Sequence, residues 1–243
     1  MSLTDILLRA LYPEKCPLCR KLLPFNQNYC PDCVETEKRI SGNFCEKCGN
    51  ENERCICSDN SICFSHFTSV FIYSGLTRAK IHDFKFNKNI RLGKSLGDDM
   101  SFRVAEVFYD VTFDAVTFVP MTEKHEKERG YNQSEILAKQ VSKHFSTPCN
   151  KLLTKVKETE NQHTLDAEKR RNNLDGAFAV SAGADITGKT ILLCDDIKTT
   201  GTTLKQCEKL LFEKGAKDVY CISVAMTDYG DIFRPLDKHN QTY

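Results

Sequence analysis

The 243-residue chain lacks an excess of charge of one sign, a long apolar run and any low-complexity tract. Its net charge of +1 offers no bulk attraction to nucleic acid, so such a contact would need a local basic patch. No apolar run reaches the roughly 18–20 residues that cross a bilayer, so we expect no membrane span. With 40% apolar and 28% charged residues, the composition excludes a disordered, collagen-like or coiled-coil chain.

The length suits one large domain, or a medium domain with a small module, that buries roughly 70–75% of the unfolded surface. An apolar stretch at residues 3–11 is interrupted by Asp5 and Arg9, which predicts a short amphipathic helix and not a signal peptide. We therefore expect a cytoplasmic protein.

Cysteine is abundant, with 13 residues, and most of them lie near the N-terminus. In a reducing compartment, clustered cysteines favour metal thiolates over a disulfide framework. A redox role for the C-x-x-C pairs would need a thioredoxin-like strand–helix–strand context, which does not surround them. The clustered residues are Cys16, Cys19, Cys30, Cys33, Cys45, Cys48, Cys55, Cys57 and Cys63.

Two C-x-x-C pairs come first, Cys16 with Cys19 and Cys30 with Cys33. Each pair forms a knuckle that presents two thiolates to one ion, so the two pairs predict a tetrahedral zinc site. With four thiolates no coordination position stays open, and the zinc would be structural. The alternative is that these cysteines are small buried hydrophobic residues.

A second zinc site is predicted from Cys45, Cys48, Cys55 and Cys57. The C-x-C spacing of the last two is tighter than the usual knuckle, so the fourth ligand stays open among Cys55, Cys57 and Cys63. Metal binding would supply the folding free energy that the few apolar residues of this region cannot. We expect residues 1–66 to form a small cysteine-rich zinc-binding module.

From about residue 67, short β-rich segments alternate with segments of helical periodicity. Strands that interleave with helices predict an α/β domain with a mostly parallel sheet covered on both faces, spanning residues 67–243. Ligands of such sheets bind beyond the carboxyl ends of the strands. We expect strands at 69–73, 115–119, 177–180, 190–194 and 219–225, and helices at 76–86, 97–108, 134–145 and 203–214.

The most informative stretch runs from residue 191 to residue 203, where an apolar strand leads into Asp195 and Asp196 and then into a Thr/Gly loop. Small residues around Gly201 allow backbone N–H groups to face one point, and the next helix adds partial positive charge, so we expect a bound phosphate monoester. The two acids suit sugar hydroxyls or Mg²⁺, and together they predict a ribose phosphate site. A Thr-rich turn that caps an ordinary helix is the alternative. The loop residues are Thr199, Thr200, Gly201, Thr202 and Thr203.

A second phosphate-loop pattern, G-x-x-x-x-G-K-T, lies directly upstream at residues 183–190. A nucleotide-binding loop of this type opens a helix after its Thr, whereas here the apolar run that follows Thr190 is typical of a strand. We interpret this pattern as a turn that enters the strand.

Basic residues and aromatic rings alternate between residues 78 and 94, where Asp83 is the only acid. Such interleaving is typical of a surface that follows a phosphate backbone while rings stack on bases. A solvated helix face with a core-facing phenylalanine pair is the alternative. The residues are Lys80, Lys85, Lys88, Arg91 and Lys94, around Phe84 and Phe86.

Two further basic segments flank the expected ligand edge. Arg129, Asn132 and Gln133 end a charged loop that follows the strand at 115–119, where a parallel sheet would present them to a ligand. Lys169, Arg170 and Arg171 precede the strand at 177. Ordinary surface charge is the alternative for both.

In this order, the motifs resemble the ComF family (ComFC, or GntX-like), small proteins with a zinc module and a type I phosphoribosyltransferase domain. The resemblance covers nearly the whole chain. It rests on Cys16 to Cys19 with Cys30 to Cys33, Ile81 to Phe86, Val119 and Pro120 leading to Glu128 to Ser134, Arg170 to Leu174 before Ala177, and Asp195 and Asp196 with Thr199 to Thr203.

The resemblance implies a double zinc ribbon-like module, a type I phosphoribosyltransferase-like sheet and phosphoribosyl pyrophosphate (PRPP) as the ligand. The 5-phosphate would bind at 199–203, the ribose hydroxyls at Asp195 and Asp196, and the pyrophosphate with Mg²⁺ near the loop after Pro120. Asp195 and Asp196 would be the catalytic residues. Further contacts to pyrophosphate or DNA would come from Lys85, Arg129, Asn132, Gln133, Arg170 and Arg171. Lys198 departs from the family pattern, because many relatives carry an apolar or small residue there.

Two functions are compatible with the resemblance. In the first, the protein binds PRPP and handles incoming single-stranded DNA in the cytoplasm during natural transformation, together with competence proteins. In the second, it is a Mg²⁺-dependent phosphoribosyltransferase, of the amidophosphoribosyltransferase kind, that stabilises an oxocarbenium ion and transfers ribosyl phosphate to an unknown acceptor.

Overall fold

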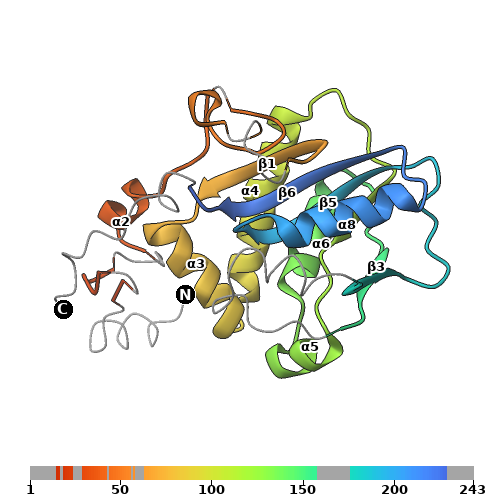
Figure 1. The fold of residues 1–243 in the computed structure, drawn as a ribbon. Helices are drawn as coiled ribbons and strands as arrows, with labels where there is room; N and C mark the ends of the chain where they lie inside the picture. Colours follow the sequence, from red (N-terminus) through yellow and green to blue (C-terminus); the bar gives the residue numbers. More distant parts are fainter. Residues whose placement is uncertain are drawn as a thin grey trace, which may run out of the picture.

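The fold is built on a four-stranded sheet with the order β1–β6–β5–β2, in which every neighbouring pair is parallel (Figure 1). The strands are β1 (His66–Ile72), β2 (Ala115–Phe118), β5 (Thr190–Lys198) and β6 (Asp218–Met226). The structure is a computed structural model that describes residues 15–16, 19–23, 29–42, 44–55, 57, 63–157 and 176–228.

Helices cover both faces of the sheet, as the sequence pattern predicts. α3 (Gly75–Phe86), α4 (Ile90–Val107) and α6 (Gln133–His144) pack on one face, and α8 (Thr202–Glu213) packs on the other. Figure 1 draws α8 in front of the sheet and α4 and α6 behind it. Strand β5 is central, and its residues from Ile191 to Cys194 are fully buried, which explains the unbroken apolar run.

Four predicted helices and four strands of the sheet are confirmed, with shifted ends. β5 runs four residues beyond its predicted end at residue 194, and α4 begins at Ile90, where the Asn89 side chain caps it by accepting from Leu92 N at 3.1 Å. The predicted strand at 177–180 is β4 (Phe178–Val180). It lies outside the parallel sheet, paired antiparallel with β3 (Leu153–Lys155).

Our prediction of a charged loop before Arg129 is wrong, because Glu123–Arg129 forms helix α5. Thr122 caps this helix, its hydroxyl accepting from His125 N at 3.4 Å. None of its residues is buried, so no apolar periodicity marked it in the sequence.

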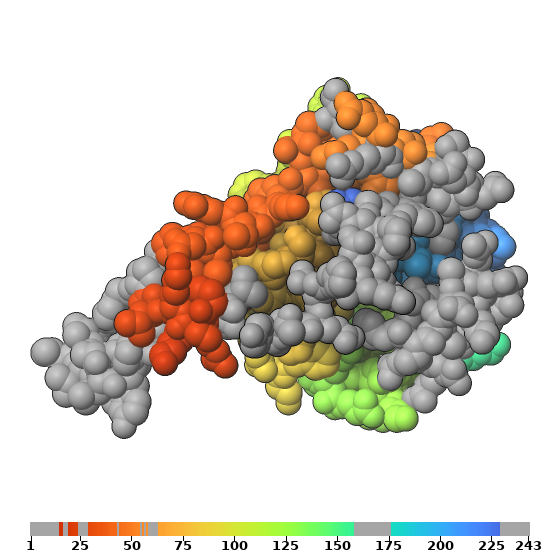
Figure 2. Space-filling model, turned by 60° about the vertical axis from the view of Figure 1, so that its left-hand side comes forward, coloured from red at the N-terminus to blue at the C-terminus, as the bar shows by residue number. Residues whose placement is uncertain are grey.

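The cysteine-rich segment carries a short helix α2 (Pro31–Glu35) and a 3₁₀ turn η1 (Asn52–Arg54). It packs along the edge strand β1, where Ile40 N donates to Val70 O at 2.9 Å and Ile72 N donates to Lys38 O at 2.9 Å. In the space-filling view, its red and orange residues form a band beside the yellow residues of α3 (Figure 2). Among the helices described here, none combines the length and apolar character needed to cross a bilayer.

Candidate functional site

The loop between β5 and α8 lies at the carboxyl end of the central strand. Gly201 is the N-cap of α8 and has a left-handed φ of 85°, a conformation that other residues adopt only with strain. Thr200 Oγ1 lies 2.9 Å from Thr202 Oγ1 and 3.4 Å from Thr202 N. The first backbone N–H groups of α8 have no partner within the helix and carry partial positive charge, which favours an anion at this point.

Asp195 is buried beside this loop, with 8% of its surface exposed. Its Oδ1 accepts from Ser134 Oγ at 2.8 Å and from Asp196 N at 2.8 Å. Burial, and then the charge of Asp196, raises the pKa of Asp195 to about 7 despite these two hydrogen bonds. The carboxyl group is thus held rigidly in a site that disfavours its charge, and a cationic or hydroxyl-bearing ligand would stabilise the charged form.

Asp196 is paired with a lysine from another element. Lys85 Nζ, near the end of α3, lies 2.9 Å from Asp196 Oδ2, and both side chains are largely buried. The structure therefore brings together Lys85, predicted as a phosphate or DNA contact, with the acidic pair from β5.

The turn from α5 to α6 supplies three more predicted site residues. Asn132 caps α6 by accepting from Ser134 N at 3.0 Å, and its amide donates to Val119 O at 3.1 Å. This side chain therefore caps α6 with its oxygen and ties the turn to the residue after β2 with its nitrogen. Gln133 is 1% exposed and accepts from Arg129 Nη1 at 3.2 Å. Its Nε2 is buried without a hydrogen-bond partner among the described residues.

The basic and aromatic residues of 78–94 divide between core and surface. Phe84 is fully buried, whereas Phe86 is 58% exposed. The alternative of two core-facing phenylalanines is therefore correct for Phe84 and wrong for Phe86. The Arg129 guanidinium lies 5.5 Å from the Phe86 ring centroid, and the His82 ring lies 4.6 Å from it. Lys80 instead pairs with Glu37 of the cysteine-rich segment at 2.8 Å.

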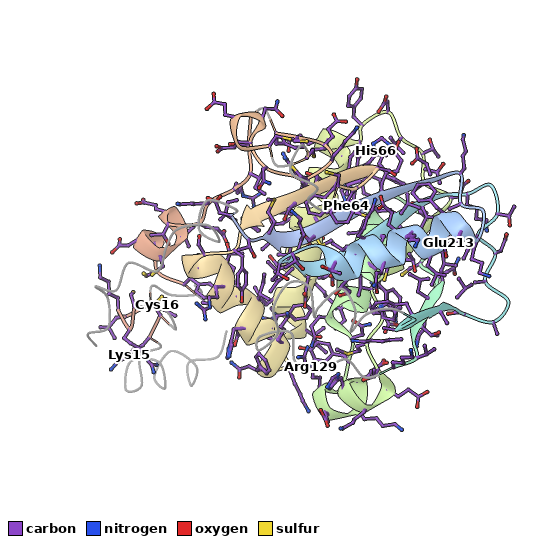
Figure 3. All side chains as sticks on the ribbon, in the orientation of Figure 1. Lys15, Cys16, Phe64, His66, Arg129 and Glu213 are labelled. Carbon is purple, nitrogen blue, oxygen red and sulfur yellow. The ribbon has the colours of Figure 1, made fainter. Side chains whose placement is uncertain are left out.

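Phe86, His82, Lys88 and Arg129 form an exposed group, which we call the basic–aromatic corner. Figure 3 draws Arg129 between α3 and α5. Phe86, His82 and Lys88 are exposed, and Arg129 is partly exposed. Arg91 and Lys94 are also exposed on α4. Lys169, Arg170 and Arg171 lie outside the described residues, as does the helix predicted at 3–11.

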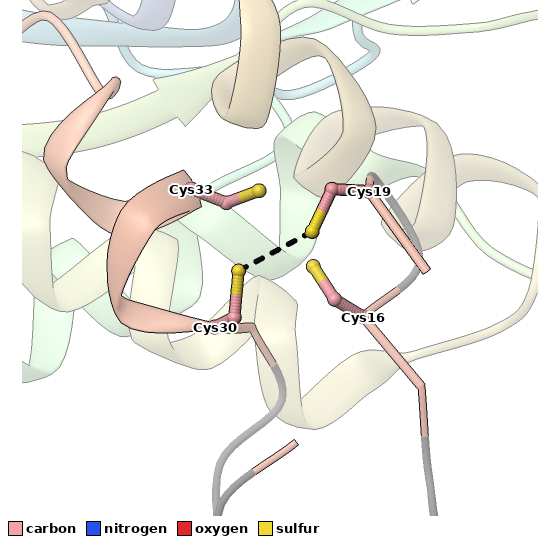
Figure 4. A group of neighbouring side chains, drawn as sticks. All are labelled: Cys16, Cys19, Cys30 and Cys33. Atoms are coloured by element: carbon pink, nitrogen blue, oxygen red, sulfur yellow. Dashed lines mark hydrogen bonds between the residues drawn. The ribbon is translucent and has the colours of Figure 1, made fainter. Parts of the chain in front are cut away.

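Two groups of four cysteines have the arrangement of zinc ligands. Within each group the sulfur atoms lie within 4.8 Å of one another. A tetrahedral site with Zn–S bonds of about 2.3 Å places its sulfurs about 3.8 Å apart, so the donor sets fit zinc. Cys19 and Cys30 approach to 3.4 Å (Figure 4), and Cys45 and Cys57 to 3.7 Å. The groups are Cys16, Cys19, Cys30 and Cys33, called site 1, and Cys45, Cys48, Cys55 and Cys57, called site 2.

The geometry favours Cys55 and Cys57 over Cys63 as the ligands that the sequence left open. Cys55 and Cys57 both join site 2, with Cys48 Sγ 3.9 Å from Cys55 Sγ. Cys63 lies next to the group, its sulfur 3.9 Å from the carbonyl oxygen of Cys57.

The upstream G-x-x-x-x-G-K-T pattern is a turn, as the sequence predicts. Thr190 begins β5, and no helix follows it. Lys189 pairs with Asp185 at 2.6 Å, on an exposed part of the surface. This turn therefore lies at the amino end of β5, opposite the Thr/Gly loop.

Two residues of the site were missed as site residues in the sequence. Ser134 holds Asp195, and its only signal was its place next to Asn132 and Gln133. Lys198 is 1% exposed at the end of β5, and its Nζ donates to Cys48 O at 2.9 Å. Burial lowers the pKa of Lys198 to about 8. The charges of nearby cysteines, Cys48 foremost, raise the pKa but do not outweigh burial. A contact across 150 positions leaves no local sequence signal.

Comparisons with known proteins agree with both parts of this architecture. The family model for the double zinc ribbon domain matches residues 7–65, and that for the phosphoribosyl transferase domain matches residues 132–237. The second match omits β1, α3, α4 and β2, which the structure joins to the same domain.

Several curated proteins are similar over most of the chain. Competence protein ComFC of Bacillus subtilis is 27% identical over 87% of this chain and 85% of its own. Competence protein F of Haemophilus influenzae is 28% identical, over 84% and 93%. DNA utilization protein YhgH of Escherichia coli K12 is 25% identical, over 86% and 96%.

The parallel sheet, the acidic pair in β5 and the Thr/Gly loop before α8 define a phosphoribosyltransferase-type domain, here preceded by a double zinc ribbon. The ribbon and its two cysteine groups support structural zinc. Over most of its length the chain is similar to proteins named competence protein ComFC and competence protein F.

Proposed function

We propose that this protein binds PRPP, or a related ribose phosphate, at the carboxyl end of β5. One observation carries the proposal: two carboxylates near the carboxyl end of the buried strand β5 are followed by a left-handed glycine that caps the amino end of α8. The helix end suits the 5-phosphate, and the acids suit the ribose hydroxyls. The phosphoribosyl transferase family model over residues 132–237 supports the same ligand.

Magnesium fits the same edge, because carboxylate oxygens are the ligands it prefers. Asp195 and Asp196 would face the ion and the sugar, and Lys85 would exchange its pairing with Asp196 for one with the ligand. The ion would neutralise part of the pyrophosphate charge. Asp195 would then be held ionised by the bound cation, against the burial that raises its pKa.

We further propose that the basic–aromatic corner binds single-stranded DNA. Phe86 offers an exposed ring on which a base can stack, and Arg129 and Lys88 supply positive charge to the backbone. Lys85 joins the corner to the acidic pair, so DNA and ribose phosphate would occupy adjoining surfaces. The names of the relatives, which refer to competence and DNA utilization, support a role in handling incoming DNA in the cytoplasm during natural transformation, together with competence proteins.

Calorimetric titration with PRPP and Mg²⁺ tests the first proposal. Wild-type protein should bind, and Asp195→Asn should weaken binding by about tenfold or more, because a buried charged acceptor is lost. Asp185→Asn is the matched control, since Asp185 is an exposed carboxylate in the turn at the amino end of β5. Absence of wild-type binding at millimolar PRPP, or equal affinity of Asp195→Asn, would contradict the proposal.

The same samples separate a binding protein from a transferase. Release of pyrophosphate from PRPP when candidate amines are supplied would make the protein an enzyme on an acceptor of that class. PRPP binding without pyrophosphate release supports a binding role.

Fluorescence anisotropy with a labelled oligo(dT) tests the DNA surface. Phe86→Ala should weaken binding by about 5- to 100-fold, the range expected for one lost stacking ring. Arg129→Ala should weaken binding and reduce its salt dependence. Phe102→Ala is the control, because Phe102 is a 65% exposed ring on α4 outside the corner. Equal losses from Phe86→Ala and Phe102→Ala would refute the assignment of the surface.

A further inference from the structure

Lys198 joins the phosphate loop to zinc site 2. It is the last residue of β5, directly before the loop at 199–201, and its ammonium group donates to the carbonyl oxygen of Cys48 at 2.9 Å. Cys48 is both a knuckle residue and a member of site 2. Since Lys198 is 1% exposed, its charge is almost entirely removed from water.

A buried ammonium group is costly unless an anion or strong acceptors compensate it. Four thiolates outweigh the charge of one zinc ion, so a loaded site 2 carries net negative charge beside Lys198. The negative charge of the zinc site and the positive charge of the lysine therefore stabilise each other. Without the metal, the Cys48 knuckle is no longer fixed, and neither is the carbonyl oxygen that accepts from Lys198.

Packing contacts also connect the loop at 199–201 to the knuckle of Cys48. A Cβ at Gly201 would lie 3.1 Å from Phe64 Cζ and 3.3 Å from Lys198 Cε, so the loop rests on both side chains. Phe64 stacks on Phe67, and Lys198 Nζ lies 5.3 Å from the Phe67 ring centroid. A Cβ at Gly49, next to Cys48, would lie 2.5 Å from the Phe67 ring. The knuckle, the two rings and the loop thus form one packed unit.

Site 1 is attached elsewhere. Its buried cysteines pack with Tyr29 and with Leu76 of α3. The nearby Glu37 accepts from Lys80, also on α3, at 2.8 Å. Loss of zinc from site 1 should therefore disturb α3 first, whereas loss from site 2 acts directly on the loop.

We propose that Lys198 is a positioning residue through which zinc in site 2 holds the loop at 199–201 in its ligand-binding shape. The proposal rests on the phosphate-binding function proposed above. It makes zinc at one end of the chain a requirement for binding at a loop 150 residues away.

Hydrogen–deuterium exchange of the full-length, zinc-loaded protein tests the coupling without any ligand. Cys55→Ser and Cys19→Ser are matched variants, because each removes the exposed cysteine of one site. Zinc content per chain should fall in both. Amides of 195–203 should exchange faster in Cys55→Ser, with a smaller change in Cys19→Ser. Zinc loss from site 2 with wild-type exchange at 195–203 would overturn the proposal.

Lys198→Met keeps the apolar stem and removes the charge, and it tests the link if Cys55→Ser fails to fold. This variant should retain both zinc ions, show faster exchange at 195–203, and bind PRPP about tenfold or more weakly. Adding Cys55→Ser to Lys198→Met should then weaken PRPP binding by less than Cys55→Ser does alone. Wild-type exchange and wild-type PRPP affinity in Lys198→Met would also overturn the proposal. If the wild-type protein does not bind PRPP, the proposed function fails, while the exchange measurement still decides the coupling.

Discussion

Replacement of Gly201 by alanine should damage the phosphate loop more than the protein as a whole. The φ of 85° at Gly201 costs an alanine about 1–2 kcal/mol, of which roughly 0.5–1 kcal/mol is regained because the unfolded chain is less flexible. The new Cβ would also lie 3.1 Å from the ring of Phe64, which is 3% exposed and cannot move freely. Crowding of this kind adds about 1 kcal/mol.

The free energy of unfolding should therefore fall by about 1–2 kcal/mol, and the melting temperature by roughly 2–8 °C. Binding should suffer more, because a shift of the loop misplaces several N–H donors at once. We expect PRPP affinity to fall by at least about tenfold in calorimetric titration.

Gly183→Ala is the matched control. Gly183 has a φ of 73°, but a Cβ there would meet no atom within 4 Å, and the residue belongs to the turn before β5. It should lose a similar or smaller amount of stability and keep wild-type PRPP affinity. Equal affinities in Gly201→Ala and wild type, or equal losses in both variants, would refute the role given to the loop.

Three further predictions follow from the site. Since the pKa of Asp195 is raised to about 7, its stabilising contribution is complete below about pH 4 and is lost as pH rises through 7. In ligand-free urea denaturation, the stability of wild type relative to Asp195→Asn should fall between about pH 4 and 7, and a pH-independent difference would contradict this. Lys189→Ala should change PRPP affinity by less than about twofold, and a loss like that of Gly201→Ala would restore the nucleotide-binding alternative. Chelation or Cys16→Ser should unfold the cysteine-rich segment. Purified protein should hold about two zinc ions, and a zinc content near zero would exclude both sites.

Local patterns were sufficient for much of this fold. The buried strand β5, the capped helix α6 and the α8 helix after Gly201 each carry their signal within a few residues. Two errors have local causes as well. α5 has no buried residue and hence no apolar stripe. The start of α4 contains Gly93, a weak helix former that is needed because a Cβ there would lie 2.3 Å from the Phe84 ring.

The sequence by itself predicted the first group of four cysteines, Cys45 and Cys48 of the second, the parallel α/β sheet and the two acids that precede a Thr/Gly loop, because spacing and periodicity record these features locally. The tertiary structure alone decided which distant side chains share the site. Lys85 reaches Asp196, Ser134 reaches Asp195, and Lys198 reaches Cys48. Such contacts depend on how the helices and the zinc ribbon pack against the carboxyl ends of the strands. The linear sequence does not show which of its distant residues become neighbours when the chain folds.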